Sequence, residues 1–183
     1  MPMMIIRTKN NRNIHLQRLT KDDFKELSVY LQHLSRETKQ RFGPHGFDEK
    51  SIMEVYCDSD RVTGYIARDA GTFAIVAYSI LKIGFLEHDS FRLKSYGLVL
   101  DSKTDCTFAP SVADNWQGLG VGNCLFNFIL SDLKATGIKR IILWGGVQCD
   151  NKRAVNYYLK NGFTSLGQFE YNGLNLDMIF DIE

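Results

Sequence analysis

A glycine-rich segment near the middle of the chain has the residue types and spacing best suited to chemistry. Residues 112–122 read Val-Ala-Asp-Asn-Trp-Gln-Gly-Leu-Gly-Val-Gly, and an amphipathic pattern typical of a helix follows them. The first N–H groups of a helix have no partner inside it, and the helix dipole adds partial positive charge at that end. Because Gly118, Gly120 and Gly122 lack a Cβ, an anion can approach the backbone closely. The segment predicts a binding site for a phosphate-bearing ligand.

Two common phosphate-binding motifs fit this segment poorly. A Walker-type loop requires Lys and then Ser or Thr after its last glycine, whereas Asn123 follows Gly122 here. A dinucleotide fingerprint requires Gly-x-Gly-x-x-Gly and an acidic residue at the end of the next strand. The chain has Gly-x-Gly-x-Gly instead, and its next expected strand ends in Trp-Gly-Gly at residues 144–146.

A third pattern fits well. Residues 117–122, Gln-Gly-Leu-Gly-Val-Gly, resemble the acetyl-CoA signature of the GNAT N-acetyltransferase superfamily, (Arg/Gln)-x-x-Gly-x-(Gly/Ala). Residues 151–163 resemble that superfamily's second block, which has Asn-x-x-Ala, a pair of aromatic residues and then Gly-Phe. The resemblance is close from Thr104 to about Phe180, while the N-terminal half fits only the order of elements.

The hydrophobic periodicity predicts alternating strands and helices of a mixed α/β or α+β fold. Strands are expected at residues 13–19, 61–67, 73–85, 106–112, 140–144, 163–169 and 174–182, and helices from Phe24 to Leu34 and at residues 49–57, 120–136 and 151–160. Residues 36–47 are expected to form a loop, and residues 86–105 have room for a short helix. The resemblance implies one GNAT-like domain over residues 1–183, with a mostly antiparallel central sheet splayed at a parallel strand pair and helices on both faces.

The resemblance also implies how acetyl-CoA, the expected cosubstrate, is held. Its pantetheine arm is expected to pair with the backbone near Val112, and its pyrophosphate to sit on the N–H groups of residues 118–123. Gln117 stands where Arg is commoner, which removes one charge from the phosphate site. The expected cofactor-binding residues are Val112, Gln117, Gly118, Leu119, Gly120, Val121, Gly122, Asn123, Asn151 and Asn156. No metal site is expected.

Tyr158 occupies the position of the superfamily's general acid. Its phenol, with an ordinary pKa of about 10, keeps its proton at neutral pH and can donate it to the departing thiolate. Adjacent residues do not face one side of a helix, so one of Tyr157 and Tyr158 is expected to pack and the other to face the cleft. No general base is assigned. Four groups near the expected strand ends, interpreted as solvated surface groups, are Glu87, His88, Asp89 and Asp105.

The predicted function is acetyl transfer from acetyl-CoA to a primary amine of a small molecule by direct attack. A second hypothesis is the same chemistry on a protein or peptide amine. A third hypothesis is a non-catalytic module that binds acyl-CoA, and a fourth is a protein that does not bind CoA at all. Residues 36–47 and 86–105 are expected to form the acceptor pocket, with three side chains suited to an anionic substrate or, equally, to an ordinary surface loop: Arg36, Arg41 and His45.

Composition limits the possible partners. The chain has 183 residues, 44% hydrophobic and 23% charged, with a formal net charge of +1, so neither nucleic acid nor a membrane surface is expected as a partner. Its four cysteines are scattered and form no Cys-x-x-Cys pair, which favours free thiols in the cytoplasm. In particular, Cys149 is expected to act as a small buried apolar residue rather than as a nucleophile. The expected state is a monomer or a homodimer.

Overall fold

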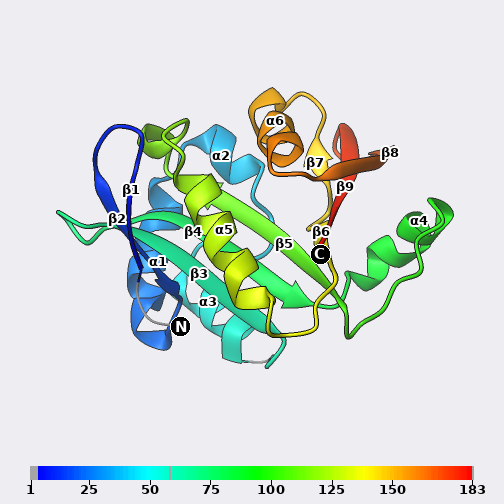
Figure 1. Cartoon of the computed structure of the whole chain (residues 1–183), viewed down its shortest axis with the longest axis horizontal. Coiled ribbons are helices and arrows are strands. Elements are labelled where there is room, and N and C mark those ends of the chain that lie inside the picture. Colours follow the sequence, from blue (N-terminus) through cyan, green and yellow to red (C-terminus); the bar gives the residue numbers. More distant parts are fainter. Residues whose placement is uncertain (1–3, 58, 183) are drawn as a thin grey trace. The chain divides into compact units, whose positions relative to one another are not determined.

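The computed structural model describes residues 4–57 and 59–182 (Figure 1). The chain forms two compact units. The first unit comprises Met1–Leu81 and Ala109–Leu133, and the second comprises Lys82–Phe108 and Lys134–Glu183. Their boundary passes through two strands, β4 (Ile75–Ile83) and β5 (Asp105–Val112). The expectation of one domain over residues 1–183 stays a prediction.

The first unit is built on antiparallel strands. In addition to the parts of β4 and β5 that belong to it, it contains β1 (Met4–Arg7), β2 (Asn13–Arg18) and β3 (Val62–Asp69), in the sheet order β1-β2-β3-β4-β5. β2 pairs with both β1 and β3 in antiparallel register. Its alternating pattern completely buries Ile14 and Leu16, as expected for a strand with one face against a core.

Helices cover both faces of this sheet. They are α1 (Phe24–His33), α2 (Arg36–Gln40), α3 (Glu49–Cys57) and α5 (Val121–Leu133). Figure 1 shows α5 on the nearer face and α1 and α3 on the opposite face. A capping box precedes α1, in which the Thr20 N–H donates to the Asp23 carboxylate at 2.7 Å. The Asp48 carboxylate accepts from the Ser51 N–H at 2.9 Å at the start of α3.

The second unit contains the parallel strand pair. Asp105–Phe108 of β5 lies parallel to β6 (Arg140–Leu143), and the remaining pairs of this unit are antiparallel. Its other elements are α4 (Ser90–Ser95), β7 (Val147–Gln148), α6 (Lys152–Lys160), β8 (Thr164–Glu170) and β9 (Leu174–Asp181). The predicted fold class, a mostly antiparallel mixed sheet with one parallel pair, is confirmed.

The expectation of a loop over residues 36–47 is wrong for its first part, which forms α2. Ser35 caps this short helix, because its hydroxyl accepts a hydrogen bond from the Thr38 N–H at 3.2 Å. An ion pair between Glu37 and Arg41 at 2.9 Å follows the same turn. The loop indicated by Gly43, Pro44 and Gly46 begins only after this turn.

Several boundaries also differ from the sequence patterns. β4 begins at Ile75 rather than Phe73, whose φ of 60° places it in the preceding turn. α5 begins at Val121 and ends at Leu133, so it is shorter than residues 120–136. The short strands β1 and β7 were not predicted. A 3-10 turn and α4 occupy part of residues 86–105, where a short helix was considered. Among the described residues, no helix is long and apolar enough to cross a membrane.

A buried ion pair fixes α4 to β9. Arg92 donates through Nε to the Asp177 carboxylate at 2.7 Å, and the Tyr96 hydroxyl donates to the same carboxylate at 3.1 Å. Asp177 is 1% exposed. The Arg92 guanidinium also lies 3.6 Å from the ring centroid of Phe169 and pairs with Asp89 at 2.8 Å. Removing the Asp177 carboxylate would leave the positive charge of Arg92 and the hydroxyl of Tyr96 without their main hydrogen-bond acceptor.

We therefore expect Asp177→Ala to lower the free energy of unfolding by about 2–3 kcal/mol. Asp181→Ala is the matched control on the same strand, since Asp181 is 68% exposed and pairs with Arg140 at 3.2 Å; we expect it to cost under about 1 kcal/mol. Urea unfolding of both variants measures the difference. Equal losses would contradict the structural role assigned to Asp177.

Candidate functional site

β5 changes its pairing halfway along its length. Its parallel ladder with β6 ends at Phe108, where the Trp144 N–H donates to the Phe108 carbonyl at 3.0 Å. Just past the end of the strand, the Ala113 N–H donates to the Val76 carbonyl of β4 at 2.9 Å. Beyond Phe108, no strand in the described part of the chain pairs with the edge of β5 that faces away from β4. An open strand edge of this kind can bind an extended amide chain through backbone hydrogen bonds.

A glycine turn joins β5 to α5, and we call residues 113–120 the phosphate loop. Gly118 and Gly120 have φ values of 77° and 87°, a left-handed conformation that glycine adopts without steric cost. No described residue accepts a hydrogen bond from the N–H groups of residues 118–121. These N–H groups stand at the start of α5, where the helix dipole also favours an anion.

Gln117 closes the phosphate loop. Its side-chain amide donates to the Val112 carbonyl at 3.1 Å, across the turn. The residue that replaces the commoner Arg therefore has an observed role in the shape of the loop. The predicted contacts of Val112, Gln117 and the glycines with a cofactor stay predictions.

The β1–β2 hairpin supports the phosphate loop, which the sequence did not reveal. The Lys9 N–H donates to the Leu119 carbonyl at 3.2 Å. The Arg12 guanidinium lies 3.7 Å from the ring centroid of Trp116 and pairs with Asp69 at 2.9 Å. The only local signal was the adjacent pair Asn10-Asn11, since Asn tolerates the left-handed turn conformation that Asn11 adopts with φ 62°.

Asp114 ties the phosphate loop to α2. Its carboxylate accepts from the Ser35 N–H at 2.9 Å, from the Ser35 hydroxyl at 2.8 Å and from the Thr38 hydroxyl at 2.8 Å. Partial burial opposes ionisation of this carboxyl, but the hydrogen bonds from Ser35 and Thr38 outweigh it and lower the pKa of Asp114. Asp114 therefore stays ionised and holds the start of residues 36–47 in place.

Tyr158 lies on α6 in the second unit and is 7% exposed. Its ring centroid lies 5.2 Å from those of Tyr157 and Phe163. The two neighbouring tyrosine rings thus contact each other, with Tyr158 buried and Tyr157 half-buried. The expectation that one of them packs and the other faces a cleft stays a prediction. Burial raises the pKa of the Tyr158 phenol above its usual value. Among the described residues, none forms a hydrogen bond with its hydroxyl, which keeps its proton available for a ligand.

The two asparagines predicted to bind the cofactor lie on or beside the same helix. Asn151 is the N-cap of α6, and its side-chain oxygen accepts from the Ala154 N–H at 3.2 Å. Its side-chain NH2 group is not needed for this cap. Asn156 is exposed on the helix. Their contacts with a cofactor stay predictions.

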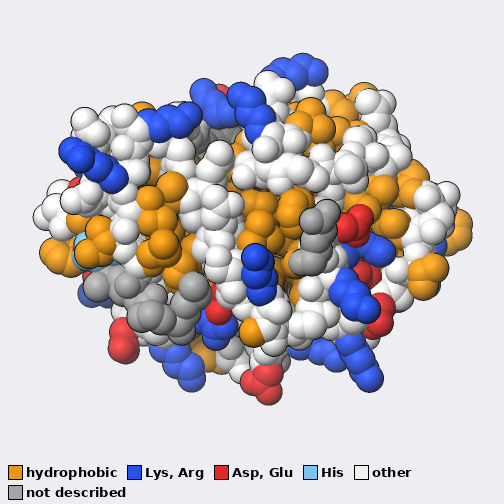
Figure 2. All heavy atoms as spheres, viewed as in Figure 1, with side chains coloured by type: hydrophobic (Ala, Val, Ile, Leu, Met, Phe, Trp, Pro, Cys, Tyr) orange, Lys and Arg blue, Asp and Glu red, His pale blue; other side chains and the backbone are white. Residues whose placement is uncertain are grey.

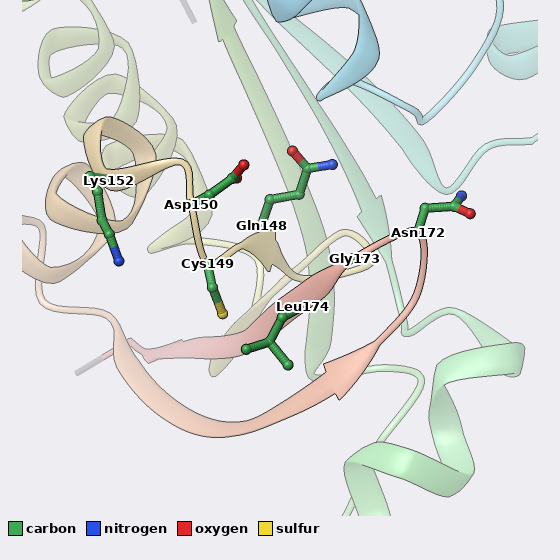
Figure 3. Close-up of a pocket in the computed structure, with 7 residues that line it drawn as sticks. All are labelled: Gln148, Cys149, Asp150, Lys152, Asn172, Gly173 and Leu174. Carbon is green, nitrogen blue, oxygen red and sulfur yellow. The ribbon is translucent and has the colours of Figure 1, made fainter.

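A cavity of about 440 Å³ lies beside the start of α6 (Figure 3). The segment between β7 and α6 forms one wall, and the β8–β9 turn forms the other. Figure 3 shows Gln148 and Asp150 projecting to the same side of their segment. Cys149 is half-buried and lines the cavity, so its predicted place as a buried apolar residue is wrong. The lining residues are Gln148, Cys149, Asp150, Lys152, Asn172, Gly173 and Leu174.

His45 belongs to a chain of hydrogen bonds inside the first unit. Its Nδ1 lies 2.7 Å from the Gly46 carbonyl and must donate to it, because a carbonyl only accepts. In the neutral ring Nε2 then accepts, from the Tyr78 hydroxyl at 2.8 Å. The Tyr56 hydroxyl in turn donates to Tyr78 at 2.7 Å. Burial lowers the pKa of His45, so the neutral ring offers no charge to the anionic substrate considered for it.

Two of the acidic groups near the strand ends are buried, so their interpretation as solvated surface groups is wrong. Asp89 is 5% exposed and pairs with Arg92. Asp105 is 2% exposed, and burial raises its pKa although the Asp101 N–H donates to its carboxylate at 2.8 Å. Glu87 and His88 are exposed, as expected. Both buried carboxylates have structural partners.

A sequence model of one protein family matches most of the chain, and this match shows to which family the chain belongs. The sequence model of the Acetyltransferase (GNAT) family matches residues 28–163, which include the open edge of β5, the phosphate loop and α6. The chain belongs to this family. The predicted membership and the predicted class of enzyme, an acetyl-CoA-dependent N-acyltransferase, are confirmed. No curated protein matches the chain.

Solved structures of GNAT proteins have the same fold at low sequence identity. The GNAT domain of S. lividans PAT has a TM-score of 0.75 and 19% identity, with 98% of this chain and 96% of that chain covered. Ribosomal-protein-S5-alanine acetyltransferase from Vibrio fischeri has a TM-score of 0.70 and 12% identity, covering 93% of each chain. An aminoglycoside acetyltransferase in complex with coenzyme A has a TM-score of 0.67 and 19% identity, covering 92% and 94%.

The hydrogen bonds of His45 predict a pH dependence of stability in this GNAT protein. Burial makes the pKa of His45 lower in the folded state than its ordinary value of about 6.5. The contribution of the neutral ring to the free energy of unfolding is therefore complete above about pH 6.5, and it is lost as the pH falls through the folded-state pKa. Urea unfolding between about pH 7.5 and pH 5.5 should show a smaller pH slope in His45→Gln than in the wild type. His33→Gln is the control, since His33 is exposed on α1. An unchanged slope in His45→Gln would contradict this role.

Proposed function

We propose that this GNAT protein transfers the acetyl group of acetyl-CoA to the primary amine of a small molecule by direct attack. The phosphate loop is the observation that carries the proposal. Its left-handed glycines leave the N–H groups of residues 118–121 without described acceptors at the start of α5. A structure with the same fold contains coenzyme A, which supports this choice of phosphate ligand.

In this proposal the cofactor is bound mainly through the backbone. The pyrophosphate accepts hydrogen bonds from the N–H groups of the phosphate loop and the first turn of α5, at residues 118–123. The amide groups of the pantetheine arm pair with the open edge of β5 near Val112. Asn151 and Asn156 donate further hydrogen bonds through their side-chain amides. Gln117 acts by holding the loop in shape through its bond to Val112.

The proposed reaction needs one bond made, one broken and two protons placed. A neutral amine attacks the thioester carbonyl carbon and forms the C–N bond. The tetrahedral intermediate collapses with loss of the C–S bond, and the Tyr158 hydroxyl donates its proton to the CoA thiolate. Water takes the surplus proton of the amine and returns one to Tyr158. Burial keeps Tyr158 protonated at neutral pH, because it raises the pKa of the phenol.

A small-molecule acceptor is supported by the cavity beside α6. Its volume of about 440 Å³ lies in the range of small-molecule sites, roughly 300–1,000 Å³. Its lining carries one charge of each sign, from Asp150 and Lys152, so the support for a small molecule comes from the volume of the cavity and not from its charge. The chain's four cysteines are all free thiols, which supports a cytoplasmic site of action.

Substitutions at Gly120 test the phosphate loop. Both Gly120→Ala and Gly120→Glu place a side chain at a φ of 87°, so they share the same backbone strain. Only Glu adds negative charge beside the proposed pyrophosphate. We expect the CoA dissociation constant of Gly120→Glu to exceed that of Gly120→Ala by at least about tenfold, measured by isothermal titration. Equal constants would place the pyrophosphate elsewhere.

Tyr158→Phe tests the chemistry. We expect kcat to fall about 100-fold, with little change in KM for acetyl-CoA, while Tyr157→Phe stays within about threefold of the wild type. The assay follows CoA release with a panel of polyamines, amino sugars, amino acids and peptides with free N-termini. Product from peptides alone would shift the proposal to a protein acceptor. CoA binding without turnover of any amine would indicate a binding module.

A further inference from the structure

Lys9 in the turn of the β1–β2 hairpin lies over the phosphate loop. Its N–H donates to the Leu119 carbonyl at 3.2 Å, which fixes the position of its backbone. Its side chain continues across Gly120, so that a Cβ placed on Gly120 would lie 3.7 Å from both Cγ and Cε of Lys9. The ammonium group is one bond beyond Cε. Backbone and side chain together hold a positive charge beside the glycine whose N–H is expected to bind phosphate.

The other polar groups around the loop are already engaged. Arg12, the second cation of this hairpin turn, pairs with Asp69 and stacks on Trp116. Gln117 carries no charge, and its amide donates to Val112. Lys9 is exposed and, among the described residues, has no ion-pair partner. Figure 2 shows basic side chains, in blue, at the end of the first unit where this hairpin turns.

We propose that Lys9 binds the pyrophosphate of coenzyme A and supplies the positive charge that Gln117 lacks at the phosphate loop. This inference rests on the proposed function, because it needs coenzyme A as the ligand. The ligand moiety is the pyrophosphate rather than the 3′-phosphate, since Lys9 lies over Gly120. Gly120 belongs to residues 118–121, whose N–H groups have no acceptor among the described residues. An ammonium ion beside a doubly charged pyrophosphate makes a charge-assisted hydrogen bond.

The arrangement also explains why a hairpin so far from the loop in sequence is built against it. The Lys9–Leu119 hydrogen bond uses a carbonyl of the loop and leaves the N–H groups of residues 118–120 to the ligand. Arg12 and Trp116 make a second, independent attachment. The hairpin can therefore hold the ammonium group near the phosphates with little loss of freedom on binding, because its backbone is already fixed.

The test compares CoA binding by Lys9→Met, which keeps the apolar stem without the charge, with Lys9→Arg, which keeps the charge. We expect the dissociation constant of CoA to rise about 5- to 20-fold in Lys9→Met at low salt and to stay within about threefold of the wild type in Lys9→Arg. Lys25→Met, on the exposed side of α1, is the matched loss of one charge and should change nothing. The difference should shrink as NaCl is raised from about 0.05 to about 0.5 M.

Two ligands that lack some or all of the phosphate groups of CoA locate the contact. With dephospho-CoA, which lacks the 3′-phosphate, Lys9→Met should show the same relative loss, and with pantetheine it should show none. A loss that disappears with dephospho-CoA would overturn the assignment to the pyrophosphate. CoA affinity equal in wild type and Lys9→Met would overturn the inference and leave the proposed function standing. Failure of the wild type to bind CoA would instead overturn the proposed function itself.

Discussion

The phosphate loop must be rigid while the N–H groups of residues 118–120 stay without an acceptor among the described residues, and several contacts of the first unit serve this requirement. A loop usually becomes rigid by pairing its own backbone, which would consume the donors that a phosphate needs. Here the attachments use other atoms. Gln117 bonds to the Val112 carbonyl, Lys9 to the Leu119 carbonyl, and the Asp114 side chain to residues at the start of α2. The loop is therefore preorganised for an anion, with the cost met when the chain folds.

Buried polar groups in each unit play a comparable part at a larger scale. In the first unit, the Tyr56–Tyr78–His45 chain holds the segment after α2 against β4, and burial lowers the pKa of its imidazole. In the second unit, Asp177 and Arg92 fix α4 to β9. Such groups are costly to bury unless each finds its partner, so they specify one arrangement of the segments that carry them. The two segments first considered for substrate binding, residues 36–47 and 86–105, are the ones held in this way.

The sequence predicted the longer elements and the two family blocks well, because their signals are local. The capping pairs Thr20 with Asp23 and Asp48 with Ser51 are examples of such local signals, since each acts over only a few residues. The segment Arg36–Gln40 was predicted to be a loop because three helix breakers lie close to it, Gly43, Pro44 and Gly46, whereas the structure forms a short helix capped by Ser35. β1 is too short and too near the chain terminus for periodicity to reveal it, and it becomes a strand through pairing with β2.

The sequence by itself determined the glycine spacing of the phosphate loop, the position of Tyr158 within the second family block and, through both, the family. Glycine placement can be read locally because a left-handed φ is a property of single residues. Only the tertiary structure decided which side chains surround the loop. Lys9, Arg12 and Ser35 come from elements distant in sequence, and long-range sheet pairing and helix packing bring them to residues 113–120. Which cations and hydrogen-bonding groups serve the site therefore depends on contacts that no local pattern encodes.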